Sequence, residues 1–301
     1  MRRLYFHEVG PRDGLQNEPV FVPTAAKRAM VEALADCGFA KVEVTSFVSP
    51  AAIPALRDAD ELVRSLRRVA GVAYTALVPN QRGAERAIAA GVDEISVVMS
   101  ASESHNRANL RRSREESRCH LLELVRSLPG DLPVTLAVST AFGCPFEGYV
   151  PFSQVLELVD VFADAGVSRF TLCDTTGMAH PAQVRAAVEA LRRRATRIEY
   201  CLHFHDTRGL GLANILAAVE AGMDRFEGSV GGLGGCPYAP GASGNVASED
   251  AVHLLHTLGH STGVDLDRVL AVSRGLAGVV GHSGHGRLAK AGLAAPCGAF
   301  R

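Results

Sequence analysis

Short apolar runs alternate with alanine-rich amphipathic stretches along most of this chain. Four of the amphipathic stretches end in the same way, with a glycine that precedes a new apolar run; these are Gly38, Gly91, Gly166 and Gly222. Glycine adopts the left-handed conformation at a helix end without steric cost, so each junction is typical of a helix, a cap and then a strand. Their recurrence indicates a repeated unit.

Eight apolar runs have the length and residue types of strands. They cover residues 4–9, 41–47, 72–79, 94–100, 134–140, 169–174, 198–205 and 225–230. Helical patterns follow them, among them residues 24–36, 81–90, 114–128, 153–165, 181–194 and 210–221. Eight alternations predict an α/β protein closed into a (β/α)8 TIM barrel. An open doubly wound sheet more often carries a Gly-x-Gly-x-x-Gly turn after its first strand, and this sequence lacks one there.

The pattern changes after residue 262. We expect residues 1–262 to form a catalytic barrel domain, because barrels of about 250 residues are ordinary. Residues 263–301, with a helix over about 265–280, are expected to form a helical appendage that packs on the barrel or against a second subunit.

Composition excludes several classes of protein. The chain has 301 residues, a net charge of -1 and dispersed Lys and Arg residues, which disfavours a nucleic-acid partner. Its apolar runs are shorter than the roughly 18 residues that cross a bilayer, and the strand pattern begins at residue 4, so we expect a cytoplasmic protein without membrane contact. Seven cysteines without a Cys-x-x-Cys pair argue against a disulfide framework and a structural zinc site.

His203 and His205 are two positions apart in the seventh predicted strand. Residues i and i+2 of a strand share a face, so both imidazoles point the same way. They lie at the carboxyl end of that strand, where barrel enzymes carry their chemistry. The pair therefore predicts half of a metal site, with two histidines satisfied by ordinary hydrogen bonds as the alternative.

Asp13 follows the first predicted strand and adds a carboxylate oxygen to the two imidazoles. Such a set suits Mg2+, Mn2+, Zn2+, Co2+ or Fe2+, and the ligand types do not choose among them. The adjacent Arg12 is permanently charged and can stabilise an oxyanion. A local salt bridge between Arg12 and Asp13 is the alternative.

Six glycines occupy residues 231–245, which follow the last predicted strand. The segment lacks the Gly-Lys-Ser/Thr ending of a nucleotide-binding loop. Such a permissive backbone can form a lid that delivers Cys236, a thiol able to act as an acid, although a passive turn is the alternative. Asn245 ends the segment, where it can bind a metal or cap a helix that starts near residue 246.

Four segments resemble hydroxymethylglutaryl-CoA lyase: EVGPRDGLQNE (residues 8–18), VEVTSFVSP (42–50), LHFHDT (202–207) and GLGGCPYAPGASGN (232–245). The resemblance extends over nearly the whole chain. It implies cleavage of 3-hydroxy-3-methylglutaryl-CoA to acetyl-CoA and acetoacetate with Mg2+ or Mn2+, a step of leucine degradation and ketone-body formation.

The resemblance also implies roles for individual residues. The metal ligands would be Asp13, His203, His205 and Asn245. Arg12 would stabilise the enolate, Glu43 would be a supporting acid, and Cys236 would be the lid thiol. Beside these roles, we expect Arg12, Gln16 and Asn245 to bind the substrate. Gln16, Asp174 and Asp206 are expected to support the site by hydrogen bonds, with plain structural hydrogen bonds as the alternative for each. The base for the substrate hydroxyl stays open between Asp13 and His203.

Partners and rival functions complete the prediction. Four arginines can receive the phosphates of an acyl-CoA or form a solvated helix start: Arg107, Arg111, Arg112 and Arg114. The resemblance makes Cys297 a candidate regulatory thiol, with an idle cysteine as the alternative. A homodimer is expected. The rival functions are a lyase for a longer 3-hydroxy-3-alkylglutaryl-CoA or citramalyl-CoA, a Claisen-condensing synthase, an iron oxygenase with two histidines and one carboxylate, and a non-catalytic CoA-binding protein.

Overall fold

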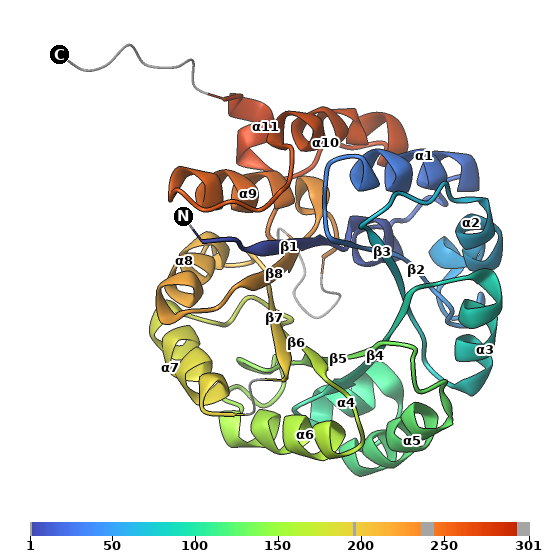
Figure 1. The fold of residues 1–301 in the computed structure, drawn as a ribbon, viewed down its shortest axis with the longest axis vertical. Coiled ribbons are helices and arrows are strands. Elements are labelled where there is room, and N and C mark those ends of the chain that lie inside the picture. Colours follow the sequence, from blue (N-terminus) through green and yellow to red (C-terminus); the bar gives the residue numbers. More distant parts are fainter. Residues whose placement is uncertain (1, 195–196, 236–243, 294–301) are drawn as a thin grey trace.

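The eight predicted strands form one closed, parallel barrel in a computed structural model of the chain (Figure 1). The structure describes residues 2–194, 197–235 and 244–293. The strands are β1 (Tyr5–Glu8), β2 (Lys41–Ser46), β3 (Ala73–Leu77), β4 (Glu94–Ser100), β5 (Val134–Ser139), β6 (Arg169–Asp174), β7 (Glu199–Phe204) and β8 (Arg225–Gly228). The predicted TIM barrel is confirmed.

Helices surround the barrel (Figure 1). They are α1 (Thr24–Ala35), α2 (Ala59–Ser65), α3 (Gln81–Ala90), α4 (Glu103–Leu110), α5 (Arg114–Ser127), α6 (Phe152–Asp164), α7 (Pro181–Arg192), α8 (Gly211–Ala221), α9 (Ser248–Thr257), α10 (Leu266–Val280) and α11 (Arg287–Ala291). The sequence pattern did not predict α2, α4 and α11, because helices of five to eight residues are too short to show a clear period.

The recurring glycines have the predicted conformation. Gly91 and Gly222 end α3 and α8 with φ of 93° and 103°, in the left-handed region. Gly38 and Gly166 also have positive φ, 88° and 99°. A side chain at Gly38 would in addition lie 2.4 Å from the carbonyl oxygen of Gly263, so glycine is required there for the chain after α9 to pack against the end of α1.

Charged side chains form a ring inside the amino-terminal end of the barrel. Lys41 and Arg169 both pair with Glu94, and Arg225 pairs with Glu199. Each of these residues is the first of its strand, so they lie at one level. Bulky aliphatic side chains fill this level in most such barrels. Here ion pairs take their place, and small polar residues line the cavity above them.

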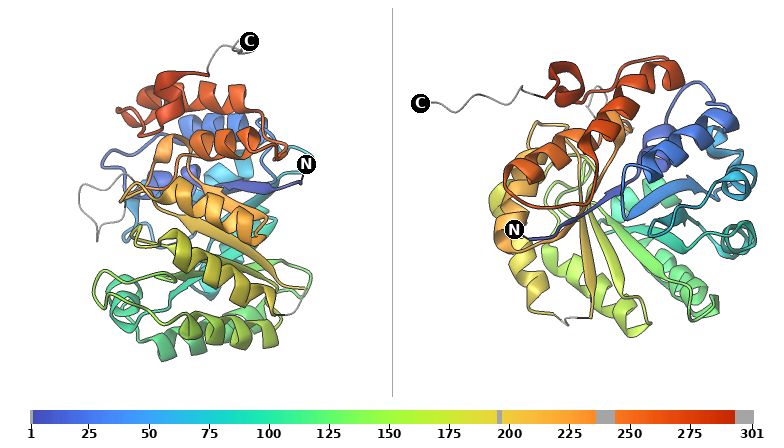
Figure 2. Two further views of the ribbon diagram at one scale, coloured as in Figure 1. Left: turned by 90° about the vertical axis from the view of Figure 1, so that its left-hand side faces the viewer. Right: turned by 45° about the horizontal axis from the view of Figure 1, so that its top comes forward.

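Helices α9, α10 and α11 stack against the side of the barrel beside α1, as both views of Figure 2 show. Glu249 of α9 links α10 to the segment after β8, since its carboxylate accepts hydrogen bonds from Ser273 Oγ (2.6 Å) and Gly231 N (3.0 Å). Val269 and Leu276 of α10 belong to the same apolar core as the barrel helices. The domain boundary at residue 262 stays a prediction.

Within the described ranges, no helix is both long and apolar enough to cross a membrane.

Candidate metal centre and active site

Arg12 and Asp13 lie on a single π-helical turn, Gly10–Gly14, that follows β1 directly. The carbonyl oxygen of Val9 accepts hydrogen bonds from the backbone N–H of both Arg12 (3.1 Å) and Asp13 (2.7 Å). Single π turns are frequent at functional sites, because they direct neighbouring side chains away from the ordinary helical spacing. Here the turn directs both side chains into the barrel mouth.

Glu8 holds this turn to the end of β8 from a fully buried position. Its Oε1 accepts hydrogen bonds from the backbone N–H of Gly10 (2.7 Å) and Val230 (2.9 Å), and its Oε2 accepts one from Ser248 Oγ (2.6 Å). Burial outweighs these donors and raises the pKa of Glu8 to about 7 from 4.5. Sequence analysis missed this residue, because its neighbours across the barrel are more than 200 positions away.

The pKa of Glu8 predicts a pH dependence of stability. Because the folded-state pKa is raised, the native state holds this proton more tightly than the unfolded chain does. The resulting stabilisation is complete below about pH 4.5 and is lost as the pH rises through about 7. We expect Glu8→Gln, whose amide can keep all three contacts, to remove up to about 3 kcal/mol of pH-dependent unfolding free energy across this window. Urea unfolding at pH 5 and pH 8 measures the difference. The exposed Glu189→Gln is the control, and a pH slope unchanged by Glu8→Gln would contradict the prediction.

Asp13, His203 and His205 converge as predicted, with ligand atoms that all lie within 4.8 Å of one another. His203 is in β7, and His205 follows it and pairs with Asn245 in an isolated β-bridge. Burial and the neighbouring His203 lower the pKa of His205 to about 3, so its imidazole is neutral, which is the form that binds a metal.

The fourth predicted ligand, Asn245, is fixed beside Asp13. Its Nδ2 donates to Asp13 Oδ2 (2.8 Å) and to the carbonyl oxygen of Leu233 (2.9 Å). Asn245 Oδ1 and His205 Nδ1 are both buried and have no hydrogen-bond partner among the residues that the structure describes. Because orphaned buried acceptors are costly, the donor set fits a hard or borderline divalent cation. The alternative of a helix cap is wrong, since α9 begins at Ser248 without a side-chain cap.

Arg12 lies between two carboxylates. Its Nε and Nη2 atoms are 2.6 Å from Oε2 of Glu43, and its Nη1 is 2.6 Å from Oδ1 of Asp13. The local salt bridge with Asp13 therefore exists, together with the bridge to Glu43. Burial would lower the pKa of Arg12, but the two carboxylates outweigh burial and raise it. A guanidinium has five N–H donors, so at least two remain for a ligand in the cavity.

Glu227 of β8, which the sequence analysis did not single out, positions His203. Its Oε1 lies 2.9 Å from His203 Nδ1. Burial would lower the pKa of His203, but the hydrogen bond and charge of Glu227 raise it. A carboxylate only accepts, so Nδ1 donates and Nε2 is the remaining nitrogen. His203 can therefore act through Nε2 as a metal ligand or as a base, but not as both at once.

Asp13 is the other candidate base. Burial would raise the pKa of its carboxyl group, but Arg12 and the histidines lower this pKa to about 2. Both oxygens of this carboxylate also have hydrogen-bond partners.

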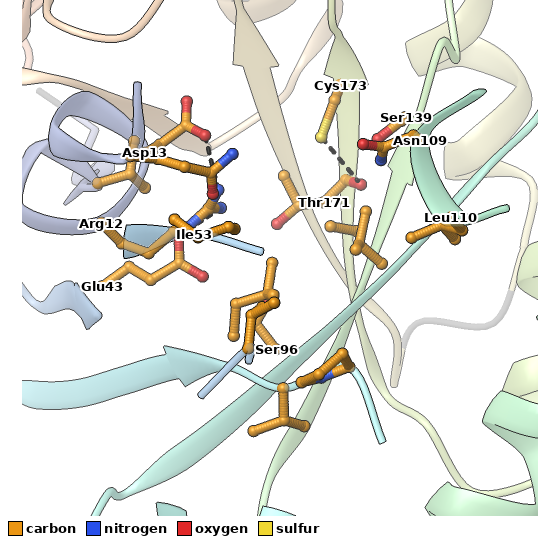
Figure 3. Close-up of a pocket in the computed structure, with 18 of the residues that line it drawn as sticks. Arg12, Asp13, Glu43, Ile53, Ser96, Asn109, Leu110, Ser139, Thr171 and Cys173 are labelled. Carbon is orange, nitrogen blue, oxygen red and sulfur yellow. Dashed lines mark hydrogen bonds and ion pairs between the residues drawn. The ribbon is translucent and has the colours of Figure 1, made fainter. Parts of the chain in front are cut away.

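A cavity of about 1000 Å³ connects these groups with the barrel mouth. Arg12, Asp13 and Glu43 lie on one side of it and Thr171 and Cys173 on the other (Figure 3). The predicted substrate residue Gln16 lines the same cavity, as do Arg111 and Arg112 near its mouth.

The remaining predicted residues have other surroundings. Arg107 pairs with Glu103. Asp174 accepts backbone hydrogen bonds from Met178 and Ala179, and Asp206 accepts one from Gly211, so both carboxylates order loops after their strands. Cys236 and Cys297 lie outside the described residues.

Comparison with known proteins identifies the family of this chain. The family model described as HMGL-like matches residues 3–275. A hydroxymethylglutaryl-CoA lyase from Bacillus subtilis is 47% identical over 275 residues, which cover 91% of this chain and 92% of the relative. The chain belongs to the HMGL-like family. The resemblance stated from the sequence motifs is therefore confirmed.

Two other relatives bear on the choice of substrate. A structure of an HMG-CoA lyase from Acinetobacter baumannii, in complex with coenzyme A and 3-methylmalate, has a TM-score of 0.93 and 45% identity, and the match covers 96% of this chain and 95% of that one. An (R)-citramalyl-CoA lyase from Chloroflexus aurantiacus is 40% identical, over 98% of this chain and 97% of the relative.

Proposed function

We propose that this HMGL-like protein is a hydroxymethylglutaryl-CoA lyase, a carbon–carbon lyase that cleaves 3-hydroxy-3-methylglutaryl-CoA to acetyl-CoA and acetoacetate with Mg2+ or Mn2+. One observation carries the proposal. An arginine fixed by two carboxylates lies beside a group of potential metal ligands within one cavity, in a chain 47% identical to such a lyase.

The metal would be held by Asp13, His203, His205 and Asn245. A divalent cation held by these residues would supply Lewis-acid chemistry, which lowers the pKa of a substrate hydroxyl. The hydroxyl proton passes to His203 if Nε2 of His203 is not a metal ligand, and to Asp13 if it is. Breakage of the bond between the carbinol carbon and the carbon next to the thioester then moves an electron pair toward the thioester oxygen.

Arg12 stabilises the resulting enolate oxygen. Its guanidinium does not exchange a proton, and the ion pairs with Glu43 and Asp13 hold it in place before the reaction begins. Glu43 thus acts as the supporting acid by orienting Arg12. Gln16 contacts the substrate from the same cavity, Asn245 does so from its place beside Asp13, and Arg111 and Arg112 bind CoA phosphates at the cavity mouth.

Cys236 is proposed to protonate the carbanion carbon of the enolate, which completes acetyl-CoA. We expect Cys236→Ser to keep substrate binding and lose turnover by about 100-fold or more, since general acids contribute that much or more. Steady-state kinetics and substrate binding by calorimetry measure the two effects. Cys119→Ser, at an exposed position of α5, is the matched control. Full turnover in Cys236→Ser would remove the thiol from the mechanism.

The family membership also supports three broader proposals: a role in leucine degradation, a cytoplasmic location, and a homodimer formed through residues 263–301. Sedimentation of the full chain measures the oligomeric state.

Citramalyl-CoA is the second candidate substrate because of the Chloroflexus relative. Its carboxylate is attached directly to the carbinol carbon, one methylene closer than in 3-hydroxy-3-methylglutaryl-CoA, and its cleavage releases pyruvate instead of acetoacetate. One methylene changes kcat/KM by about 10-fold or more.

The test compares both thioesters with Mg2+ or Mn2+, and again after chelation. Acetoacetate release, abolished by chelation, is the expected result. A higher kcat/KM for pyruvate release would favour the second substrate, and cleavage of neither would contradict a lyase. Oxygen uptake without CoA products would instead indicate an iron oxygenase.

A further inference from the structure

A second group of potential metal ligands lies inside the barrel, closer to its amino-terminal end than the first. It consists of His7, Cys201 and Glu227, which come from the neighbouring strands β1, β7 and β8. Glu227 is the register partner of His7 and lies between the other two strands. His7 and Cys201 are buried.

Two of the three separations in this group are close to those that a tetrahedral metal imposes. Cys201 Sγ is 3.8 Å from His7 Nδ1 and 3.8 Å from Glu227 Oε2, and all three ligand atoms lie within 4.8 Å of one another. Zinc bonds of about 2.3 Å to sulfur and 2.0–2.2 Å to nitrogen or oxygen place such ligands about 3.6 Å apart. Movements of a few tenths of an ångström would therefore bring the sulfur to the required distance from both of its partners.

The donor chemistry differs from that of the first site. Asp13, His203, His205 and Asn245 offer oxygen and nitrogen, whereas this group adds a sulfur, which favours Zn2+ and other soft or borderline cations over Mg2+. Binding replaces the Cys201 S–H bond with a sulfur–metal bond and releases the proton to solvent. The positive charges of the ring nearby are balanced by carboxylates, because Lys41 and Arg169 pair with Glu94 and Arg225 pairs with Glu199.

A cation can reach this group through the cavity already described. His7 and Glu227 line that cavity together with His203. Glu227 connects the two sites, since its Oε1 contacts His203 Nδ1 at 2.9 Å while its Oε2 faces Cys201.

We propose that His7, Cys201 and Glu227 form a second metal site, which binds a soft or borderline divalent cation such as Zn2+ beneath the first site. Metal binding at this site can be measured whether or not the chain is a lyase, so the test measures binding and not turnover.

Equilibrium dialysis of the full chain with Zn2+ tests the stoichiometry. We expect two Zn2+ per chain in the wild type and in Cys119→Ser, and one in Cys201→Ser and in His7→Gln. The two site variants should still bind one Mn2+, which shows that the first site and the fold remain intact. One Zn2+ in the wild type, or two in both site variants, would overturn the proposal.

Co2+ provides a spectroscopic signature, because thiolate ligation gives a strong sulfur-to-metal charge-transfer absorption. We expect this absorption in the wild type and in Cys236→Ser, and its loss in Cys201→Ser. The Cys236 variant excludes a thiolate contributed by the glycine-rich segment. Absorption that persists in Cys201→Ser, or is lost in Cys236→Ser instead, would contradict the assignment of Cys201.

Discussion

Arg12→Lys is expected to lower kcat on the order of 10³-fold with 3-hydroxy-3-methylglutaryl-CoA as substrate. An ammonium is a point charge on a flexible stem, so it cannot keep the fixed contacts of the guanidinium with both Glu43 and Asp13 and still face the enolate. Loss of a preorganised donor to a developing oxyanion costs that much in other enzymes. Because the interaction forms in the transition state, KM should change far less than kcat.

Two measurements make the Arg12 result specific. Mn2+ binding to Arg12→Lys should stay within about 10-fold of wild type, which separates the loss of the oxyanion partner from an indirect effect on Asp13. Arg194→Lys alters a surface ion pair with Asp160 and should leave turnover unchanged. Turnover above a tenth of wild type in Arg12→Lys would contradict the proposed role of this side chain.

His205→Ala is expected to weaken metal binding by more than about 100-fold and to abolish turnover at ordinary Mn2+ concentrations. The substitution removes one of three converging side chains that are proposed to bind the metal and leaves a buried gap beside Asn245. Even changes in the residues that support a metal ligand commonly cost 10- to 100-fold in affinity, so loss of the ligand itself should cost more. Mn2+ titration followed by electron paramagnetic resonance measures the affinity.

His253→Ala is the control for this experiment, because His253 is on α9 and outside the lining of the cavity. It should bind Mn2+ as the wild type does. An unchanged metal content in His205→Ala would refute the ligand assignment, and with it the convergence of β1 and β7 as the basis of the site.

The local features of the fold followed from the sequence because they depend on near neighbours. A glycine at Gly91 or Gly222 relieves the same steric strain at the end of each helix, wherever that helix later packs. Strand alternation placed His203 and His205 on one face, and the barrel rule placed them at the active end. The bounds differ by one or two residues, since His205 lies just beyond β7 and pairs with Asn245.

The partners of these residues were not predictable in the same way. Glu227 is two positions after Arg225 in β8, so both side chains point to the inside of the barrel. This two-residue alternation was the one signal in the sequence that could have identified Glu227. Glu8 was hidden for a different reason, because its contacts with Val230 and Ser248 span more than 200 residues.

The sequence by itself therefore determined the barrel, the order of its elements and the residues at the carboxyl ends of its strands, because these depend on local periodicity and on backbone sterics. The tertiary structure decided what each side chain contacts. Arg12 joins Asp13 to Glu43, Asn245 faces Asp13 instead of capping a helix, and Glu227 lies between His203 and Cys201. Closure of the barrel brings β8 against β1, and this long-range pairing, which no local pattern encodes, sets the distances and the burial on which the chemistry depends.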